Sequence, residues 1–261
     1  MTPGIDVVVV DYRTPDDLAG FIGSFEEVRD EVDAVLHVAL VDPLDEAQHR
    51  GVVDPSCMNV QVFPTNVGYA RACNELGSRG EREVIAFFNA DTRLRPGVLA
   101  GCRQHLLDNP QVGIVGPRQV DDDCRITHGG IFGTNLHPSF GGRWRARDVG
   151  QFSEITETIS VSGSAYFIKR ECWDVLRSCP LFERVAPDAV GAFLPTQHYY
   201  EETYLSFHAR HHGWQIHYLG PLAMVHRWHQ ASPLGEIERR ILPTSRAYFR
   251  RACDEHGIDH E

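Results

Sequence analysis

The sequence predicts an α/β fold in which helices flank a mostly parallel sheet. Short apolar runs alternate with amphipathic stretches over the first 120 residues, and this alternation is typical of successive βαβ units. The run from Val84 to Phe88 is continuously apolar, as expected for a strand that helices cover on both faces. With 261 residues, 42% of them hydrophobic, the chain can form one large α/β domain or two small ones.

The elements of the first half follow from their apolar periodicity and their end signals. Thr14 precedes Pro15 at the start of the first helix, and Asn109 with Pro110 ends the third. From about residue 120 the chain becomes rich in Gly, Arg and aromatic residues, which indicates loops, irregular strands and a soft boundary. We expect strands at 6–12, 34–42, 60–64, 83–90 and 112–117, and helices at 14–28, 68–78 and 95–110.

Composition excludes several classes of protein. A net charge of −11 argues against general binding of nucleic acids or anionic membranes, because both usually recruit basic surfaces. The seven cysteines form no CxxC pair and are odd in number, so we expect a reduced, cytoplasmic chain without a disulfide scaffold. No basic leader precedes the first apolar stretch, and no segment reaches the roughly 18 apolar residues of a membrane span, so neither secretion nor a membrane helix is expected.

The usual phosphate-binding signatures are missing. Residues 11–16 follow the first strand and contain no glycine of a GxGxxG turn, and there is no Walker lysine motif. A sheet of this kind can instead hold phosphates through a divalent cation with carboxylate ligands. Asp91 follows the predicted strand at 83–90, and ligands of open α/β sheets gather at the carboxyl ends of strands. Asp91 is therefore the first candidate for a metal ligand.

Six segments together carry a family signal: VVVVDYRT (7–14), LVDPLD (40–45), NVGYARACN (66–74), FFNADT (87–92), VSGSAYFIKRECWDVL (161–176) and YYEETYLSFHARHHGWQIHYLGPLAMVHRWH (199–229). In the same order, they resemble motifs of the family 2 glycosyltransferases of the GT-A fold, in particular rhamnosyltransferase-like, inverting members. The resemblance implies a Rossmann-like, mostly parallel sheet with a mixed region on the acceptor side. Residues 1–120 would form the nucleotide-sugar-binding half and residues 121–261 the acceptor-binding and catalytic half of one compact domain.

The resemblance also implies roles for individual residues. Asp42 corresponds to the aspartate that contacts the nucleotide base, and Asp91 and His226 correspond to the ligands of Mn²⁺ or Mg²⁺. Glu202, with Glu201 beside it, takes the place of the catalytic base. On the acceptor side, at what we expect to be a strand exit, the resemblance places Gly163 and Ser164. The other residues expected to bind the nucleotide sugar are Asp11, Tyr12, Thr14, Asn66, Gly68, Arg71, Asn89 and Arg246.

Several of these residues have a purely structural alternative. Asp42 precedes a proline and could form an Asx turn, and Asn66 and Gly68 could be turn residues only. Asp91 could cap the helix around 96–107, although that helix starts late for this role. For Trp173, Trp214 and Trp228, core packing competes with stacking on a sugar.

The spacing of several histidines is compatible with a different kind of metal site. His208, His211 and His212 lie on a predicted helix, and His226 and His229 follow a strand, so a hydrolytic zinc site is conceivable. The alternative is that cationic side chains gather at the helix end before a glycine, where the helix dipole favours them. Of these residues, only His226 is taken as a ligand.

Three features depart from the family pattern. Asn89 stands where a second carboxylate often lies, which predicts weak metal binding, and Glu201 and Glu202 replace the usual Glu-Asp pair. Residues 184–198 are longer than typical and could form a lid, a specificity loop or a surface insertion. Pro243 is expected to interrupt the last helix, which carries Arg246.

The predicted function is metal-dependent, inverting transfer of a hexose from a nucleoside diphosphate sugar, of the UDP or dTDP type, to an acceptor hydroxyl. The acceptor could be a saccharide, a lipid-linked sugar or a protein, nucleic acid is not an expected partner, and an oligomer is possible. One alternative is a nucleotide-sugar-binding protein with impaired catalysis. A less favoured alternative is a sugar nucleotidyltransferase, which usually has a glycine-rich, basic loop where this chain has DYRTPDD (11–17).

Overall fold

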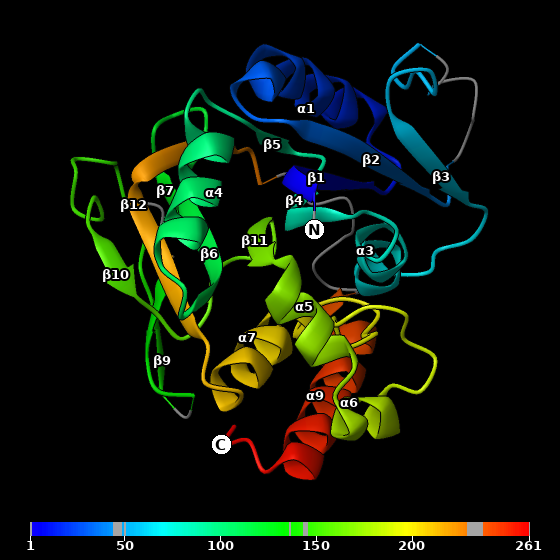
Figure 1. Ribbon diagram of the computed structural model, residues 1–261, viewed down its shortest axis with the longest axis vertical. Helices are drawn as coiled ribbons and strands as arrows, with labels where there is room; N and C mark the ends of the chain where they lie inside the picture. Colours follow the sequence, from blue (N-terminus) through cyan, green and yellow to red (C-terminus); the bar gives the residue numbers. More distant parts are fainter. Residues whose placement is uncertain are drawn as a thin grey trace.

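A large mixed sheet forms the centre of the computed structural model, which describes residues 2–43, 49, 51–135, 137–142, 146–228 and 237–260. The strands follow the order β10-β12-β6-β11-β4-β1-β2-β3, with β5 and β7 added to β12 and β6 (Figure 1). The described strands are β1 (Thr2–Asp11), β2 (Ala34–Val41), β3 (Asn59–Phe63), β4 (Arg82–Asn89), β5 (Thr92–Arg93), β6 (Val112–Val120), β7 (Ile126–His128), β8 (Ile131–Gly133), β9 (Pro138–Phe140), β10 (Ile155–Glu157), β11 (Ala165–Lys169) and β12 (Gln215–His226).

The first half has the predicted βαβ organisation. Strands β1 to β4 are mutually parallel, and each lies within a few residues of its predicted range. Helix α1 begins at Pro15 after Thr14, as predicted. The described helices are α1 (Pro15–Val28), η1 (Arg29–Glu31), α3 (Tyr69–Gly77), α4 (Val98–Asp108), α5 (Arg170–Arg177), α6 (Pro180–Val185), α7 (Glu201–His211), η2 (Ile237–Ile241) and α9 (Leu242–His256).

Strand β11 runs antiparallel to both of its neighbours, β4 and β6. Because of this reversal, β11 begins at the edge of the sheet where β4 ends: Ala165 lies opposite Phe88, and the amide of Asn89 donates to the carbonyl of Ser164 at 3.2 Å. Strand β12 then runs parallel to β6. The sheet therefore brings residues from three distant segments to one edge.

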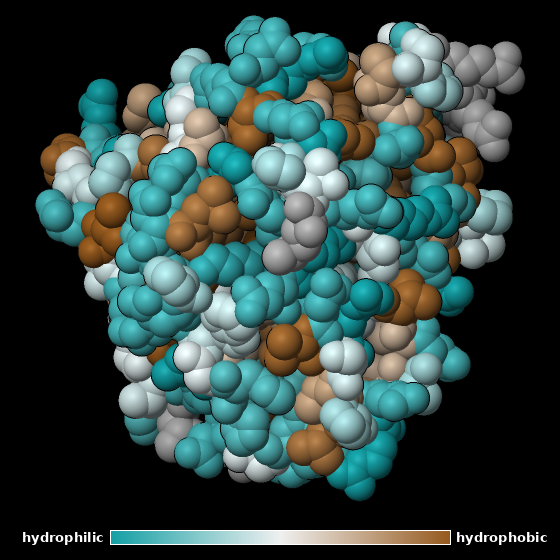
Figure 2. Space-filling model, in the orientation of Figure 1, coloured by the Kyte–Doolittle hydropathy of each residue, from teal (hydrophilic) through white to brown (hydrophobic). Residues whose placement is uncertain are grey.

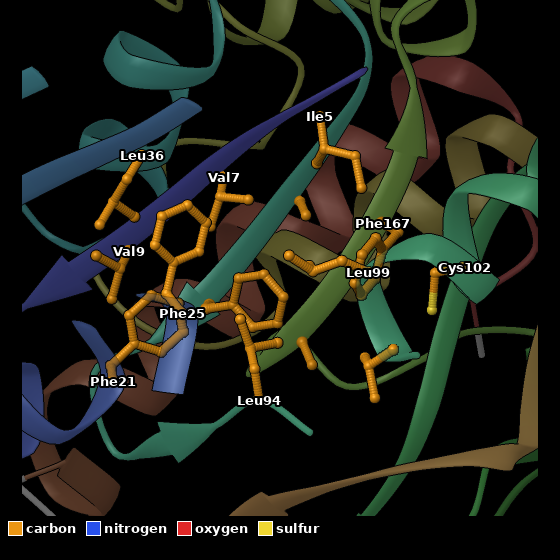
Figure 3. Packing of buried hydrophobic residues seen from close by; sticks show 14 of the residues in the cluster. Ile5, Val7, Val9, Phe21, Phe25, Leu36, Leu94, Leu99, Cys102 and Phe167 are labelled. Atoms are coloured by element: carbon orange, nitrogen blue, oxygen red, sulfur yellow. The ribbon is translucent and has the colours of Figure 1, made fainter. Parts of the chain in front are cut away.

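Helices cover both faces of this sheet. One face packs against α1 and α4, and in Figure 3 the rings of Phe21 and Phe25 lie against Val7 and Val9 of β1. The opposite face packs against α3, α5 and the inner side of α7, where Phe87 and Trp173 are fully buried. This arrangement explains why the strand at Val84 to Phe88 is apolar on both sides.

A separate apolar cluster joins α6, α7 and α9, which lie together at the bottom of Figure 1. The chain is helical on both sides of Pro243, but the geometry changes there: η2 is a π-helical turn, and the regular helix α9 begins at Leu242. Pro243 occupies the first turn of α9, where the missing amide proton of proline is not needed for a hydrogen bond within the helix.

The segment 184–198 is not a surface insertion along its whole length. Ala192, Phe193 and Leu194 are fully buried. The side chain of Asn74 in α3 donates to the carbonyl of Phe193 at 2.8 Å and accepts from its amide at 2.9 Å. The expectation of a surface insertion fails here because this pair of hydrogen bonds holds the middle of the segment in the core.

The second half and the surface have the following features. The described residues between 121 and 160 form short, irregular strands, as predicted. Hydrophilic residues cover most of the face visible in Figure 2, and hydrophobic residues occur there in small separate groups. All seven cysteines are free thiols. None of the helices in the described ranges combines the length and the apolar character needed to cross a bilayer.

A buried charge cluster fixes the amino-terminal side of the sheet. The Asp6 carboxylate is 2% exposed and accepts hydrogen bonds from Arg170 Nη2 at 2.8 Å and from the Arg82 amide at 2.9 Å, and it contacts His37 Nε2 at 3.0 Å. Burial alone would raise the pKa of Asp6, but the His37 contact, the amide and the Arg170 charge together lower it.

We expect Asp6→Ala to destabilise the fold by about 3 to 5 kcal/mol, because it leaves the buried Arg170 guanidinium without its carboxylate. Asp174→Ala is the matched control: it breaks a similar pair with Arg177 on the surface and should cost less than about 1 kcal/mol. Urea unfolding of the three proteins measures both values. A similar loss of unfolding free energy in Asp6→Ala and Asp174→Ala would contradict the stabilising role assigned to the buried cluster around Asp6.

Candidate functional site

The sheet places the two predicted metal ligands side by side. After β4 ends at Asn89, the chain turns and forms β5, which pairs with the end of β12 so that Thr92 lies opposite His226. The carboxylate Oδ1 of Asp91 lies 3.6 Å from His226 Nε2, and the Asp91 carbonyl accepts from the Arg227 amide at 3.0 Å. Asp91 is 8% exposed, and helix α4 begins too far away, at Val98 with Gly97 as its N-cap, for Asp91 to cap it.

A buried carboxamide orients the histidine. Gln119 Oε1 contacts His226 Nδ1 at 3.0 Å and accepts from Ser164 Oγ at 2.8 Å, and with the carboxamide oxygen on this side Nδ1 carries the proton of a neutral ring. Nε2 then faces Asp91 Oδ1 at 3.6 Å, and a cation between these two atoms would be stabilised by both. A histidine whose second nitrogen is held by a hydrogen bond is the usual form of a metal ligand. The pair therefore fits a divalent cation.

The predicted base lies at the start of α7. Glu201 is 5% exposed and accepts from Thr196 Oγ1 at 2.9 Å, whereas Glu202 is half-buried and packs on Gly163. A Cβ on Gly163 would lie 3.3 Å from Glu202 Cγ, so the glycine leaves the space that the glutamate occupies. Burial raises the pKa of both glutamates, and the charge of Glu202 raises that of Glu201 further.

A short segment connects the metal side of the site to the glutamate side. Ser164 touches Gln119 and His226, and the preceding Gly163 touches Glu202 and accepts from the Tyr69 hydroxyl at 2.7 Å. The sequence predicted that Gly163 and Ser164 lie at the exit of a strand. They instead precede β11, which begins at Ala165. They still face the site because β11 is antiparallel to β4 and begins where β4 ends.

The predicted base-binding residues meet at the ends of β1 and β2. Arg13 Nη2 donates to Asp42 Oδ2 at 2.6 Å, and the Arg13 guanidinium lies 5.2 Å from the ring centre of Tyr12. Asp11 is engaged on both oxygens, since Oδ1 accepts from the Thr14 amide and hydroxyl and Oδ2 lies 3.1 Å from His49 Nε2. Asp11 thus stabilises the turn from Asp11 to Thr14. Tyr12 and Asp42 are half-buried and form the surface beside this turn.

The remaining donor-side residues are partly structural. Asn66 Oδ1 accepts a hydrogen bond from the Gly68 amide at 2.9 Å. This bond closes a turn, as expected if Asn66 and Gly68 are turn residues. Gly68 has φ +80° and a Cβ there would lie 2.8 Å from the Gln197 carbonyl oxygen, so this position favours glycine. Asn89 is half-buried beside Ser164, and Arg71 is exposed on α3. Arg246 is exposed on α9 in a groove that it shares with Tyr200, next to the start of α7.

The contacts of Gln119, Tyr69 and His49 with the predicted site residues were not anticipated from the sequence. His208, which the sequence offered only as a member of a conceivable zinc site, is fully buried, and burial lowers its pKa to about 2. Trp173 is core, as the structural alternative proposed, whereas Trp228 is 41% exposed and stacks on His226. His229 lies outside the described residues.

The comparisons with known proteins show the fold. No protein-family model and no curated protein sequence matches the chain. Among solved structures, the crystal structure of GalNAc-T7 with UDP, GalNAc and Mn²⁺ has a TM-score of 0.67 at 14% identity, over 97% of this chain and 49% of that one. The mannosyltransferase PcManGT from Pyrobaculum calidifontis, in complex with GDP-Man and Mn²⁺, has a TM-score of 0.57 at 16% identity, over 98% of this chain and 64% of that one.

A third similar structure, TarS 1–349 from S. aureus, has a TM-score of 0.57 at 13% identity over 98% of this chain and 66% of that one. The chain thus has the GT-A glycosyltransferase fold, which confirms the predicted fold class. It spans about half to two thirds of the length of these structural relatives.

The buried Glu201 predicts a specific pH dependence of stability. Because folding raises the pKa of Glu201, its protonated form stabilises the folded state at low pH, and this contribution is lost as pH rises through the folded-state pKa. Glu201→Gln is neutral throughout and keeps an oxygen that can accept from Thr196. We therefore expect the Tm of the wild type to fall relative to that of the variant as pH rises from about 5 to about 9.

Glu171→Gln is the matched control for this measurement, because Glu171 also lies in the first turn of a helix but is exposed. Its Tm should follow the wild type across the same pH range. Parallel curves for Glu201→Gln and the wild type would show that the Glu201 carboxyl titrates normally.

Proposed function

We propose that this protein transfers a sugar from a nucleoside diphosphate sugar to an acceptor hydroxyl, with a divalent metal and with inversion at the anomeric carbon. The observation that carries the proposal is the continuous arrangement from Asp91 and His226 through Ser164 and Gly163 to Glu202. It lies at the edge of a GT-A sheet where β4 ends. Such an arrangement offers a cation site and a carboxylate on opposite sides of one short segment.

The donor end of the reaction uses Asp91 and His226. Their ligand atoms would hold Mn²⁺ or Mg²⁺, which neutralises the charge of the departing diphosphate when bound. Mn²⁺ is present in the structures of GalNAc-T7 and PcManGT, and this supports the assignment of the same role to the cation here. Asn89 supplies no charge beside Asp91, so phosphate and water must complete the coordination.

The acceptor end uses Glu202. Its carboxylate takes the proton of the acceptor hydroxyl while the hydroxyl oxygen bonds to the anomeric carbon and the bond from that carbon to the diphosphate breaks. The raised pKa of Glu202 makes it a stronger base than an exposed glutamate. Glu201 is the poorer candidate because it is more buried and already accepts the Thr196 hydroxyl.

Recognition of the nucleotide base is assigned to Asp42 and Tyr12. Asp42 is held by Arg13 but remains partly exposed, and Tyr12 presents part of its ring beside it. A carboxylate can accept the imide N–H of uracil or thymine as well as the N1–H of guanine, so the choice of a UDP or dTDP sugar as the donor rests on the family resemblance. The complex of PcManGT with GDP-Man shows that the same fold also accommodates a guanine nucleotide, so the base is tested directly below.

Metal dependence is the first test. Asp91→Asn should abolish the stabilisation by Mn²⁺ of the complex with nucleoside diphosphate, because it removes the charged ligand while keeping the size of the side chain. His226→Ala should weaken the same effect less completely. Isothermal titration of uridine and thymidine diphosphates with and without Mn²⁺ measures it.

Asp123→Asn is the control for charge, since Asp123 is an exposed aspartate of a nearby acidic run. It should bind nucleotide and metal like the wild type. Nucleotide affinity that does not depend on Mn²⁺ in the wild type would overturn the assignment of Asp91 and His226.

Catalysis is tested at the two glutamates. Glu202→Gln should keep metal-dependent donor binding and a Tm near that of the wild type, while sugar transfer or donor hydrolysis falls by about 10² to 10⁴ because the base can no longer take a proton. Glu201→Gln should retain most of the rate. Release of nucleoside diphosphate is the measurement, and it also separates an enzyme from a protein that only binds the donor.

The reverse result, an inactive Glu201→Gln beside an active Glu202→Gln, would assign the base to Glu201. Normal activity of both variants would show that neither glutamate is the base.

Base recognition is tested with Asp42→Ala. Loss of a hydrogen-bonding partner for the base should weaken binding of uridine or thymidine diphosphate by about 1 to 3 kcal/mol, and the fold should be unaffected because Asp42 is partly exposed. Guanosine diphosphate should bind the wild type weakly and should not be affected by the substitution. A preference of the wild type for guanosine diphosphate would contradict the proposed pocket.

A further inference from the structure

A second group of metal-ligand side chains lies in the cluster of α6, α7 and α9, away from Asp91 and His226. Cys179 is the N-cap of α6, His208 lies on α7, and His256 is the last residue of α9. One ligand atom from each of the three lies within 4.8 Å of the others. The three residues come from chain positions that only the tertiary structure brings together.

The burial of this group is unusual for polar side chains. His208 is 0% exposed, His256 is 4% exposed and Cys179 is 7% exposed. Within the described residues, neither ring nitrogen of His208 has a hydrogen-bond partner. Buried polar atoms nearly always have a partner, so an imidazole with two such nitrogens calls for a specific explanation.

The surroundings favour a metal over a proton as that explanation. His256 lies with its ring centre 4.6 Å from that of His208, so protonation of either ring would place a charge beside the other. Burial lowers the pKa of both rings, to about 2 for His208, and neutral imidazole is the form that binds metals. The Tyr204 hydroxyl contacts the His256 ring nitrogens at 3.2 and 3.4 Å and can hold that ring in one orientation.

We propose that Cys179, His208 and His256 bind one Zn²⁺ or a similar late transition-metal ion. A thiolate with two imidazoles suits Zn²⁺, whereas Mn²⁺ and Mg²⁺ prefer oxygen ligands. Zn–N bonds of about 2.0 Å and a Zn–S bond of about 2.3 Å require the ligand atoms to lie less than about 4 Å apart, so on binding an ion the three side chains would move closer together than the present 4.8 Å limit. Binding releases the thiol proton of Cys179 to solvent.

Water or His212 would occupy the fourth coordination position of the ion. This exposed residue follows α7, and its ring centre is 4.9 Å from that of His208. The ion would connect the start of α6, the last turn of α7 and the end of α9. Because α7 begins with Glu201 and Glu202, the ion would fix the helix that carries the glutamates, although the inference does not depend on the function proposed for them.

The test is a titration of the untagged, chelator-treated full chain with Co²⁺, which replaces Zn²⁺ and absorbs in the near ultraviolet when a thiolate is bound. The wild type should develop the thiolate-to-cobalt band with an end point at one equivalent, and Zn²⁺ should displace it. Cys179→Ser should lose the band, and His208→Gln and His256→Gln should weaken Co²⁺ binding.

Two control variants locate the ion. Cys253→Ser removes another buried thiol of α9 and should keep the band. His226→Ala removes the ligand near Asp91 and should also keep it. A band lost in either control but retained in Cys179→Ser would overturn the site, and so would the absence of a thiolate band in the wild type, whatever the variants do.

Discussion

The carboxamide of Gln119 is the group on which the geometry of the site depends. Its oxygen accepts from Ser164 and contacts His226 Nδ1, and in this way it joins β6, the segment before β11 and the end of β12. Without this acceptor the His226 ring could turn its other nitrogen to Asp91, and Ser164 would lose its link to the sheet. One fully buried side chain therefore sets both the tautomer of a proposed ligand and the position of the neighbouring backbone.

Two opposing effects act on the glutamates at the start of α7. The amino terminus of a helix favours a negative charge, and backbone amides there donate to both carboxylates. Burial outweighs this effect and raises both pKa values. The difference between the two residues arises from their partners: Glu201 faces Thr196 in the interior, and Glu202 faces the open backbone of Gly163.

The sequence was sufficient for features that depend on near neighbours. The βαβ half, the place of Asp91 after a buried strand and the start of α7 at the glutamates all follow from local periodicity and end signals. Gln119 could not be found in this way, because its partners lie 45 and 107 residues away. The burial of His208 was not anticipated for the same reason: its neighbours come from α6 and α9, and burial by distant elements has no local signature. The π-helical turn that precedes Pro243 likewise has no signature in the local sequence.

The position of β11 has a consequence for how the protein folds during synthesis. Strand β6 is made before β11, yet β11 lies between β4 and β6 in the finished sheet. Until the ribosome has released Ala165 to Lys169, the apolar strand β4 has one edge with unpaired amides and carbonyls. Strand β6 then lacks both of its long neighbours, because β12 is made later still. Such edges pair readily with other chains. The nascent amino-terminal half is therefore exposed to aggregation for the time needed to make the intervening residues, and β4 can be paired on both edges only when β11 arrives.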